Sequence, residues 1–284
     1  MSESRLEIEI VGEGRDLVCL HSLLSDKSSF APLAERLADR RRMILVNMPG
    51  FGASPRIAEP IDGYADAVAA LFDELSLPRE TDIVGNGFGG FVVLSLAARH
   101  GEKFDRAVLI GSAVAFPEEG RAKFRGLAER AEREGMAALA DTAMQRMFSD
   151  AFIASNPGLI AERKAVYANI PPDVFAKAAR ALARLDFAPD LAKIGNPLLV
   201  VVGSEDAATP PALGRALAAQ VAGARVIEMP GLGHCPHIQD PDAFVAAAAD
   251  FLGLGAAVAP ATEPRAARAP SGFPASARRP RPPA

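Results

Sequence analysis

The sequence predicts an α/β fold in which helices cover both faces of a mainly parallel sheet. Short aliphatic runs alternate along the chain with longer segments of helical periodicity. This alternation is typical of parallel sheets, because a helix returns the chain to the same end of the sheet before the next strand. Glycine-rich or proline-rich turns follow several of these runs, and one long helix-rich segment interrupts the alternation.

Seven segments are expected to form strands. Residues 6–11 alternate apolar and charged side chains, as a strand at the edge of a sheet does. The other six are compact β-branched or aliphatic runs, which is the pattern of buried parallel strands. These runs are residues 17–21, 43–48, 81–84, 106–111, 198–203 and 225–229. The connecting helices are expected at residues 30–38, 64–75, 89–99, 211–221 and 242–252.

The chain divides into three parts by composition. Residues 1–113 and 193–254 carry the alternation and are expected to form one α/β core. Residues 114–192 show no convincing strand and are rich in Ala, Arg, Glu and Met. We expect them to form a helical cap above the C-terminal ends of the strands, where open α/β sheets bind ligands. Residues 255–284 hold seven prolines and five arginines, so a disordered tail is expected there.

The bulk composition limits the partners. The net charge of −4 gives no electrostatic case for nucleic acid. No run reaches the roughly 18 apolar residues of a membrane-spanning helix, and the polar N-terminal segment shows no secretory signal. The two cysteines, Cys19 and Cys235, are typical of a reduced protein without disulfides, so a cytoplasmic location is expected. The four histidines lack metal-ligand spacing; neither a metal nor a cofactor is predicted, and the oligomeric state stays unknown.

The strongest local motif is Gly-Asn-Gly-Phe-Gly at residues 85–89, which follows an expected strand and opens an expected helix. This is the context of a nucleophile elbow, G-x-S-x-G, whose flanking glycines let strand and helix pack closely around a sharp turn. In this register Gly87 stands where the nucleophilic Ser is expected. A shifted register that makes Asn86 the nucleophile does not fit, because Val84 and Phe88 then occupy the two small positions.

The same turn fits two further roles. Gly85, Gly87 and Gly90 also match G-x-G-x-x-G, the phosphate-binding turn of dinucleotide-binding proteins. That turn is expected near the first strand, whereas here it follows the third core strand, and Asp105 precedes the next strand instead of ending it. The second role is that of a plain tight turn without a ligand.

Two further loops supply an acid and a base. Asp206 follows the strand expected at 198–203, and His234 follows the strand expected at 225–229. The carboxyl ends of parallel strands meet at one edge of the sheet, so both side chains can reach the elbow. The order elbow, acid, base is also that of proteins with a nucleophile elbow. We therefore predict that Asp206 and His234 form an acid–base pair, and we expect the nearby His237 at the surface or on the rim of the pocket.

With these motifs the chain resembles the α/β-hydrolase superfamily over about residues 5–254, and more narrowly the 3-oxoadipate enol-lactonase group. The other motifs that carry this resemblance are His-Ser-Leu-Leu-Ser-Asp at 21–26 and Asn-Met-Pro-Gly-Phe-Gly-Ala-Ser at 47–54. The resemblance implies an oxyanion hole formed by the backbone N–H groups of Leu23 and Phe88, which would stabilise negative charge on a carbonyl oxygen.

Gly87 departs from that family pattern, so a Ser-based acyl-enzyme mechanism is not carried over. With no side chain at residue 87, we expect the space of a Ser hydroxyl to be open. A water placed there can be activated by His234, which Asp206 orients, against a carbonyl in the oxyanion hole.

Four groups of residues have roles that the sequence leaves open. Alternative nucleophiles, none of which we favour, are Cys19, Cys235, Ser22, Ser25 and Ser112. Candidates for hydrogen bonds to the substrate are Ser22, Asn86 and Ser112. Candidates for binding a substrate carboxylate, which fit a solvated helix face equally well, are Arg125, Arg146 and Arg163. Apolar residues that line either the pocket or the core of the cap are Met144, Met147, Phe148 and Phe152.

The sequence thus predicts a cofactor-independent hydrolase of a small activated carbonyl compound, such as an enol lactone, ester, carbamate or β-keto substrate. One alternative is a non-catalytic ligand-binding or sensor protein, which needs neither Asp206 nor His234. Another is a lyase or isomerase that uses His234 as its base. A hydrolase inactivated by a Ser→Gly change at residue 87 also fits, because Gly adopts the strained elbow backbone without cost.

Overall fold

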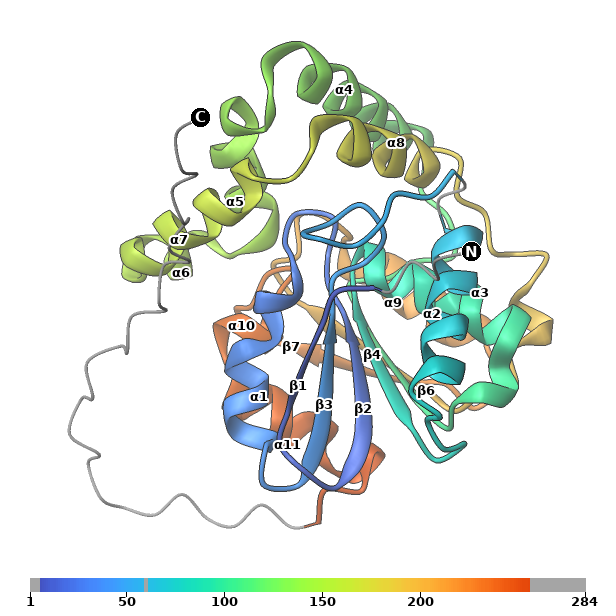
Figure 1. Cartoon of the computed structure of the whole chain (residues 1–284). Coiled ribbons are helices and arrows are strands. Elements are labelled where there is room, and N and C mark those ends of the chain that lie inside the picture. Colours follow the sequence, from blue (N-terminus) through green and yellow to red (C-terminus); the bar gives the residue numbers. More distant parts are fainter. Residues whose placement is uncertain (1–5, 59–60, 256–284) are drawn as a thin grey trace, which may run out of the picture.

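The computed structural model describes residues 6–58 and 61–255 of the 284-residue chain. Its centre is a seven-stranded sheet with the order β1-β3-β2-β4-β5-β6-β7 (Figure 1). β1 runs antiparallel to β3, and the other neighbouring strands run parallel. The strands are β1 (Ile8–Val11), β2 (Arg15–Leu20), β3 (Arg41–Val46), β4 (Asp82–Asn86), β5 (Ala107–Ile110), β6 (Leu198–Gly203) and β7 (Arg225–Met229).

Helices cover both faces of this sheet, because successive residues of a strand point to opposite faces. Leu17 and Cys19 of β2 belong to one apolar cluster, which α1 and α11 complete, whereas Val18 and Leu20 belong to a second cluster with α2, α3 and α9. These helices are α1 (Ala31–Leu37), α2 (Asp62–Glu74), α3 (Phe88–His100), α9 (Pro211–Gln220), α10 (Pro236–Gln239) and α11 (Pro241–Leu252). The predicted parallel sheet with helices on both faces is therefore confirmed.

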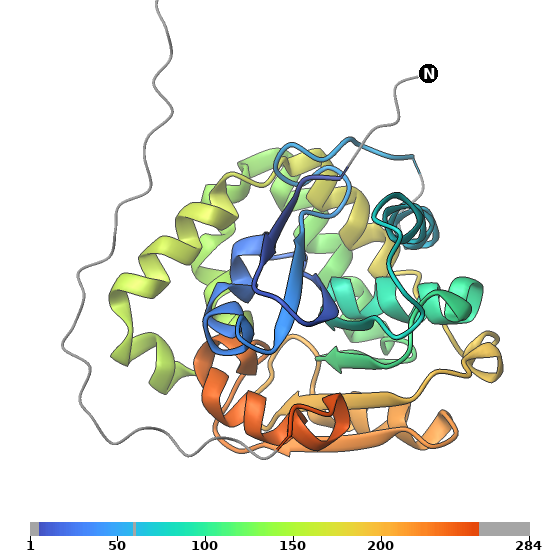
Figure 2. The same ribbon diagram turned by 60° about the horizontal axis from the view of Figure 1, so that its bottom comes forward.

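Five helices between β5 and β6 lie together over one end of the sheet (Figure 1). We call them the cap: α4 (Glu118–Glu134), α5 (Ala140–Met147), α6 (Asp150–Ser155), α7 (Pro157–Ala168) and α8 (Pro172–Leu182). α4 packs against α8, and Figure 2 shows the green and yellow cap helices as an arc around one side of the core. Short 3-10 turns are η1 (Lys27–Phe30), η2 (Gly101–Lys103), η3 (Met136–Leu139) and η4 (Leu191–Lys193).

Two segments, which we call the stems, connect the cap to β5 and to β6, and they are joined to each other. An isolated antiparallel bridge pairs Ala115 with Asp186, and the backbone N–H of Phe187 donates to the carbonyl of Val114 over 2.9 Å. The chain thus leaves and re-enters the core at one place.

The expectation of a buried strand at residues 225–229 is wrong. β7 is the last strand of the sheet, and Arg225, Val226 and Glu228 are exposed. An edge strand has a neighbour on one side only, so an aliphatic pattern alone overstates its burial. The predicted disordered tail lies outside the described residues except for Gly255. Within residues 6–58 and 61–255, no helix has the length and apolar character needed to cross a membrane.

Candidate active site

Gly87 is the single residue between β4 and α3, and its backbone angles are φ +51° and ψ −112°. Residues other than glycine rarely adopt this backbone conformation. The flanking glycines are required by close packing. A Cβ on Gly85 would lie 2.5 Å from the carbonyl oxygen of Gly89, and one on Gly89 would lie 2.2 Å from the carbonyl oxygen of Leu20. The turn therefore has the tight geometry of an elbow in the register that places Gly87 at its apex.

The loop after β6 and the loop after β7 bring Asp206 and His234 together. Asp206 Oδ2 lies 2.8 Å from His234 Nδ1. The other oxygen, Oδ1, accepts hydrogen bonds from the backbone N–H groups of Ala208 at 2.8 Å and Thr209 at 2.7 Å. Both side chains are buried. We infer that the carboxylate holds the proton on Nδ1, which leaves Nε2 of His234 free to accept one.

Two glycines enclose the imidazole of His234. A Cβ on Gly87 would lie 2.5 Å from Nε2 and 3.1 Å from Ser22 Oγ. A Cβ on Gly111, whose φ is +60°, would lie 2.5 Å from both Cε1 and Nδ1 of the same ring. The expectation of open space at residue 87 is therefore wrong, because the imidazole lies too close to leave room for a side chain there.

Asn86 fixes the loop that carries this histidine. Its Nδ2 donates to the backbone carbonyl of His234 over 2.9 Å, and its Oδ1 accepts from the thiol of Cys235 over 3.4 Å. Asn86 is buried and does not line the cavity next to His234. The structure thus places it behind the imidazole as a positioning residue, away from the predicted contact with substrate.

Leu23 follows β2 and Phe88 begins α3 directly after Gly87, and the backbone N–H of each is a candidate donor. Both residues line the same cavity as Gly87 and His234. Among the described residues, no acceptor bonds to either N–H. The positive end of the α3 dipole adds to the attraction for negative charge at Phe88. Two such donors suit an oxyanion, and the oxyanion hole expected from the resemblance stays a prediction.

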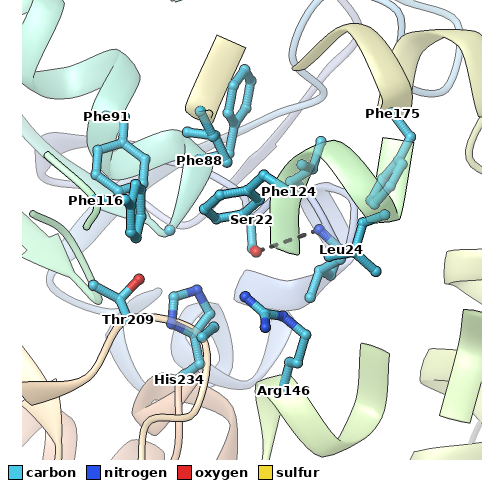
Figure 3. A pocket seen from close by; sticks show the side chains of 15 residues that line it. Ser22, Leu24, Phe88, Phe91, Phe116, Phe124, Arg146, Phe175, Thr209 and His234 are labelled. Carbon is cyan, nitrogen blue, oxygen red and sulfur yellow. Dashed lines mark hydrogen bonds between the residues drawn. The ribbon is translucent and has the colours of Figure 1, made fainter. Parts of the chain in front are cut away.

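A narrow cavity of about 30 Å³ lies between the elbow and the cap (Figure 3). Its wall is mostly aromatic and aliphatic, with Ser22, Thr209, His234 and Arg146 as its polar members. The residues supplied by the core are Ser22, Leu23, Leu24, Gly87, Phe88, Phe91, Ala208, Thr209 and His234. The residues from the cap and its stem are Phe116, Phe124, Leu127, Arg146, Phe175 and Leu182.

His21 connects the first two loops of the site. Its Nδ1 lies 2.8 Å from the carbonyl oxygen of Ser22, and its Nε2 accepts from the backbone N–H of Met48 over 3.1 Å. Burial of the ring lowers the pKa of His21 to about 4, so the ring is neutral at pH 7. One ring nitrogen donates and the other accepts, which fixes the loop that carries Leu23.

The structure gives no support to Cys19, Cys235 or Ser112 as the nucleophile, whereas Ser22 lines the cavity with its Oγ 3.1 Å from the position of a Cβ on Gly87. Burial raises the pKa of Cys19 and of Cys235 well above the ordinary value, so neither is a thiolate at neutral pH. Ser112 is buried, lacks a hydrogen-bond partner among the described residues and does not line the cavity. Its Oγ lies 2.1 Å from the position of a Cβ on Gly90, which places the hydroxyl against the elbow helix and not near the predicted substrate position. Of the two predicted serine contacts, only Ser22 reaches the cavity.

The expectation of a surface or rim position for His237 is also wrong. Its ring is fully buried and stacks on Phe30 with ring centroids 4.7 Å apart. Burial lowers the pKa of His237 to about 3. The apolar cap residues that fit either pocket or core lie outside the cavity wall, and Met144, Met147 and Phe148 are buried in the cap.

Sequence reasoning misses Gly111 and most of the cap wall. A signal for the wall is present, because Phe124 and Leu127 fall on the apolar side of α4. For Gly111 the sequence shows only a glycine at the end of a strand, and nothing in that pattern indicates the contact with His234. Within the described ranges, no group of three or more His, Cys, Asp or Glu side chains is placed to hold a metal ion.

Comparison with known proteins agrees with this geometry. Residues 17–248 match the model of the alpha/beta hydrolase family. The chain is 30% identical to a pimeloyl-(acyl-carrier protein) methyl ester esterase of Chromobacterium violaceum, over 87% of this chain and 98% of the relative. It is also 30% identical to a putative carbamate hydrolase of a Caulobacter species, over 84% and 91% of the two chains. The solved structure of an enol-lactonase from Burkholderia xenovorans superposes with a TM-score of 0.82 at 30% identity, covering 87% of this chain and 96% of that one.

The chain belongs to the alpha/beta hydrolase family. It is an enzyme of the hydrolase class, and its relatives include esterases and lactonases. The matched residues 17–248 include every residue that lines the cavity.

Proposed function

We propose that this hydrolase cleaves small activated carbonyl compounds by direct attack of water, with His234 as general base and Asp206 as its orienting partner. The observation that carries the proposal is the free Nε2 of His234 beside two N–H donors without acceptors, at an elbow that offers no nucleophilic side chain. A pair that serves only to bind ligand needs neither the fixed carboxylate nor the free ring nitrogen.

The reaction needs one water and one substrate. The carbonyl oxygen accepts from the backbone N–H groups of Leu23 and Phe88, and water approaches the carbonyl carbon from the cavity side of His234. Nε2 takes a proton from this water while the new C–O bond forms, and Asp206 stabilises the resulting imidazolium. The tetrahedral intermediate then breaks its bond to the leaving group, which takes the proton from Nε2. Positioning by Asp206 keeps Nε2 directed at the same point in both steps.

Activated substrates suit this site better than ordinary esters. Water is a weaker nucleophile than an activated Ser, so the leaving group has to depart with little assistance. Enol lactones, activated esters, carbamates and β-keto compounds meet this requirement. The names of the relatives, which include a methyl ester esterase, an enol-lactonase and a putative carbamate hydrolase, support this range of substrates.

The test compares the chain, His234→Ala and Gly87→Ser on a panel of enol lactones, p-nitrophenyl esters and activated carbamates. General-base catalysis contributes about 10²- to 10⁴-fold, so His234→Ala is expected to lower kcat/KM by at least about 10²-fold. Unchanged activity in that variant contradicts the proposal. Intact mass measured during turnover is expected to show no acyl adduct on the chain, and an adduct on the unaltered chain contradicts direct attack by water.

Two other outcomes identify the alternative functions. Ligand-dependent thermal stabilisation without turnover in any variant indicates a binding protein. Deuterium incorporation from solvent into a substrate that gains no water indicates a lyase or isomerase. Either result overturns the hydrolytic mechanism.

A further inference from the structure

Arg146 of α5 is a partly buried cation without a partner. Its guanidinium carbon lies 5.8 Å from the ring centroid of Phe124. Among the described residues, no carboxylate lies within ion-pair distance of Arg146 and no acceptor bonds to it. In Figure 3 its side chain points into the cavity between His234 and Leu24. An arginine stays protonated at physiological pH, so this is a permanent positive charge in an apolar wall.

The other arginines of the cap behave differently. All of them except Arg184 form a hydrogen bond or an ion pair with an acidic side chain or a backbone carbonyl of the protein. These pairs and contacts are Arg121 with Phe116 and Leu185, Arg125 with Glu118, Arg130 and Arg133 with Glu134, Arg163 with Glu162, and Arg180 with Glu132. Arg184 is exposed to solvent. Of the cap arginines within the described residues, only Arg146 faces the cavity without a partner.

The desolvation of Arg146 is only partly compensated nearby. Burial lowers its pKa, and the negative charge of Asp206 acts in the opposite direction. The carboxylate of Asp206 is already bonded to His234 and to two backbone N–H groups. None of the described residues that line the cavity is Asp or Glu. A partly desolvated charge without an ion-pair partner is less favourable than a paired one, so an anion that enters the cavity relieves part of this cost.

Arg146 also stands where the cavity opens outward. Two outer hollows of about 290 and 450 Å³ have it in their walls as well, the first shared with Phe116 and Phe124 and the second with Leu127. Arg146 therefore lines both the cavity that contains Leu23 and Phe88 and the two hollows outside it.

We propose that the substrate carries a carboxylate, joined to the reacting carbonyl by a short apolar segment, and that Arg146 binds this carboxylate as a specificity-determining residue. The planar guanidinium matches a carboxylate with two parallel hydrogen bonds. This inference rests on the proposed function, since it names the substrate class of the same site. The substrates are then acid esters or acid lactones, and neutral compounds of equal length react less efficiently.

The test uses two esters with acyl chains of the same length, mono-p-nitrophenyl adipate and p-nitrophenyl hexanoate. The measured quantity is the ratio of kcat/KM for the anionic ester to that for the neutral ester. Arg146→Met is expected to lower this ratio by about 10- to 100-fold, mainly through KM, because a charged hydrogen-bonded pair is lost. Arg146→Lys, which keeps the charge but not the planar fork, is expected to give an intermediate ratio.

Arg125→Met is the matched control, because Arg125 is a cap arginine paired with Glu118 and absent from the cavity wall. It is expected to leave the ratio unchanged. The assignment is overturned if Arg146→Met leaves the ratio unchanged. This includes an equal loss of kcat/KM on both esters, which shows a merely structural role.

A binding experiment separates this inference from the proposed function. Adipamic acid and hexanamide are unreactive amides of matched length, and their affinities are measured by calorimetry. The chain is expected to bind adipamic acid more tightly, and Arg146→Met is expected to abolish the difference. If the chain hydrolyses neither ester yet shows this preference, the proposed reaction fails while the carboxylate site stands. Equal affinity for both amides overturns the carboxylate site whatever the turnover.

Discussion

Nε2 of His234 lies 2.5 Å from the point that a Cβ on Gly87 would occupy. The base of this site is therefore in contact with the position where other proteins with an elbow carry their nucleophile. The ring and a side chain at residue 87 exclude each other in the present arrangement.

Gly87→Ser is expected to destabilise the chain by about 1–3 kcal/mol, because a residue with a Cβ is strained at φ +51° and ψ −112° and displaces the imidazole. The displaced ring can then activate the new hydroxyl, so an acyl adduct is expected in intact mass spectra after reaction with p-nitrophenyl acetate. Urea unfolding gives the stability change. Gly158→Ser is the control, since nothing lies within 4 Å of a Cβ there. A variant as stable as the original chain contradicts the strain at Gly87.

Gly111→Ala is expected to lower kcat by about 10²-fold, because its Cβ forces the ring of His234 away from its position and small displacements of catalytic groups have effects of this size. The positive φ of Gly111 adds a destabilisation of about 1–2 kcal/mol. Gly126→Ala on α4 meets no atom within 4 Å and is expected to leave kcat unchanged. Equal kinetics for the two variants would show that Gly111 does not restrain the base.

Asn86→Ala is expected to lower kcat with little change in KM, because Asn86 holds the carbonyl of His234 and does not touch the cavity. The loss of this buried hydrogen bond is expected to reduce the free energy of unfolding by about 1–3 kcal/mol. Steady-state kinetics and urea unfolding give the two quantities. A rise in KM at unchanged kcat instead supports direct contact of Asn86 with substrate.

The two buried histidines make the protein sensitive to acid. Their pKa values are about 4 for His21 and about 3 for His237 in the folded chain, against about 6.5 when unfolded. Between these values the unfolded chain binds more protons, so this contribution to stability is complete above pH 6.5 and is lost as the pH falls. At pH 4.5 each histidine is expected to have lost about 3 kcal/mol of its contribution.

His237→Phe tests this linkage without opening a cavity, because the ring stacks on Phe30 and its nitrogens have no partner among the described residues. The variant is expected to be as stable as the original chain at pH 7 and more stable at pH 4.5. Urea unfolding at both pH values measures this. If both proteins lose the same free energy on acidification, His237 is not the source of the sensitivity.

The strand pattern and the order of the motifs are enough to predict the sheet, the elbow and the pairing of Asp206 with His234. These features depend on local periodicity and on which ends of the parallel strands meet. The burial of His237 and the positioning role of Asn86 depend instead on which neighbour each ring or amide faces across the fold. His237 packs on Phe30, which lies more than two hundred positions earlier in the sequence. No local pattern around His237 indicates that contact.

The position of the imidazole against Gly87 lies beyond sequence reasoning for a different reason. The absence of a side chain is visible in the motif, but which neighbour fills the space depends on the backbone angles of the elbow and on the contact between the ring and Gly111. A side chain that is absent from a motif leaves an open space only where the neighbouring atoms are held away from its position.

The cavity wall has two origins. Every group that would transfer the proton or bind the carbonyl oxygen comes from the loops that follow the strands of the sheet. Arg146 and most of the aromatic side chains of the wall come from the cap. The cap is inserted at one place, where its two stems are bridged through Ala115 and Asp186. Substrate choice and reaction chemistry are thus encoded in separate stretches of the gene. Exchange of the segment between the stems can give a relative with a new substrate range while the machinery of hydrolysis is inherited unchanged.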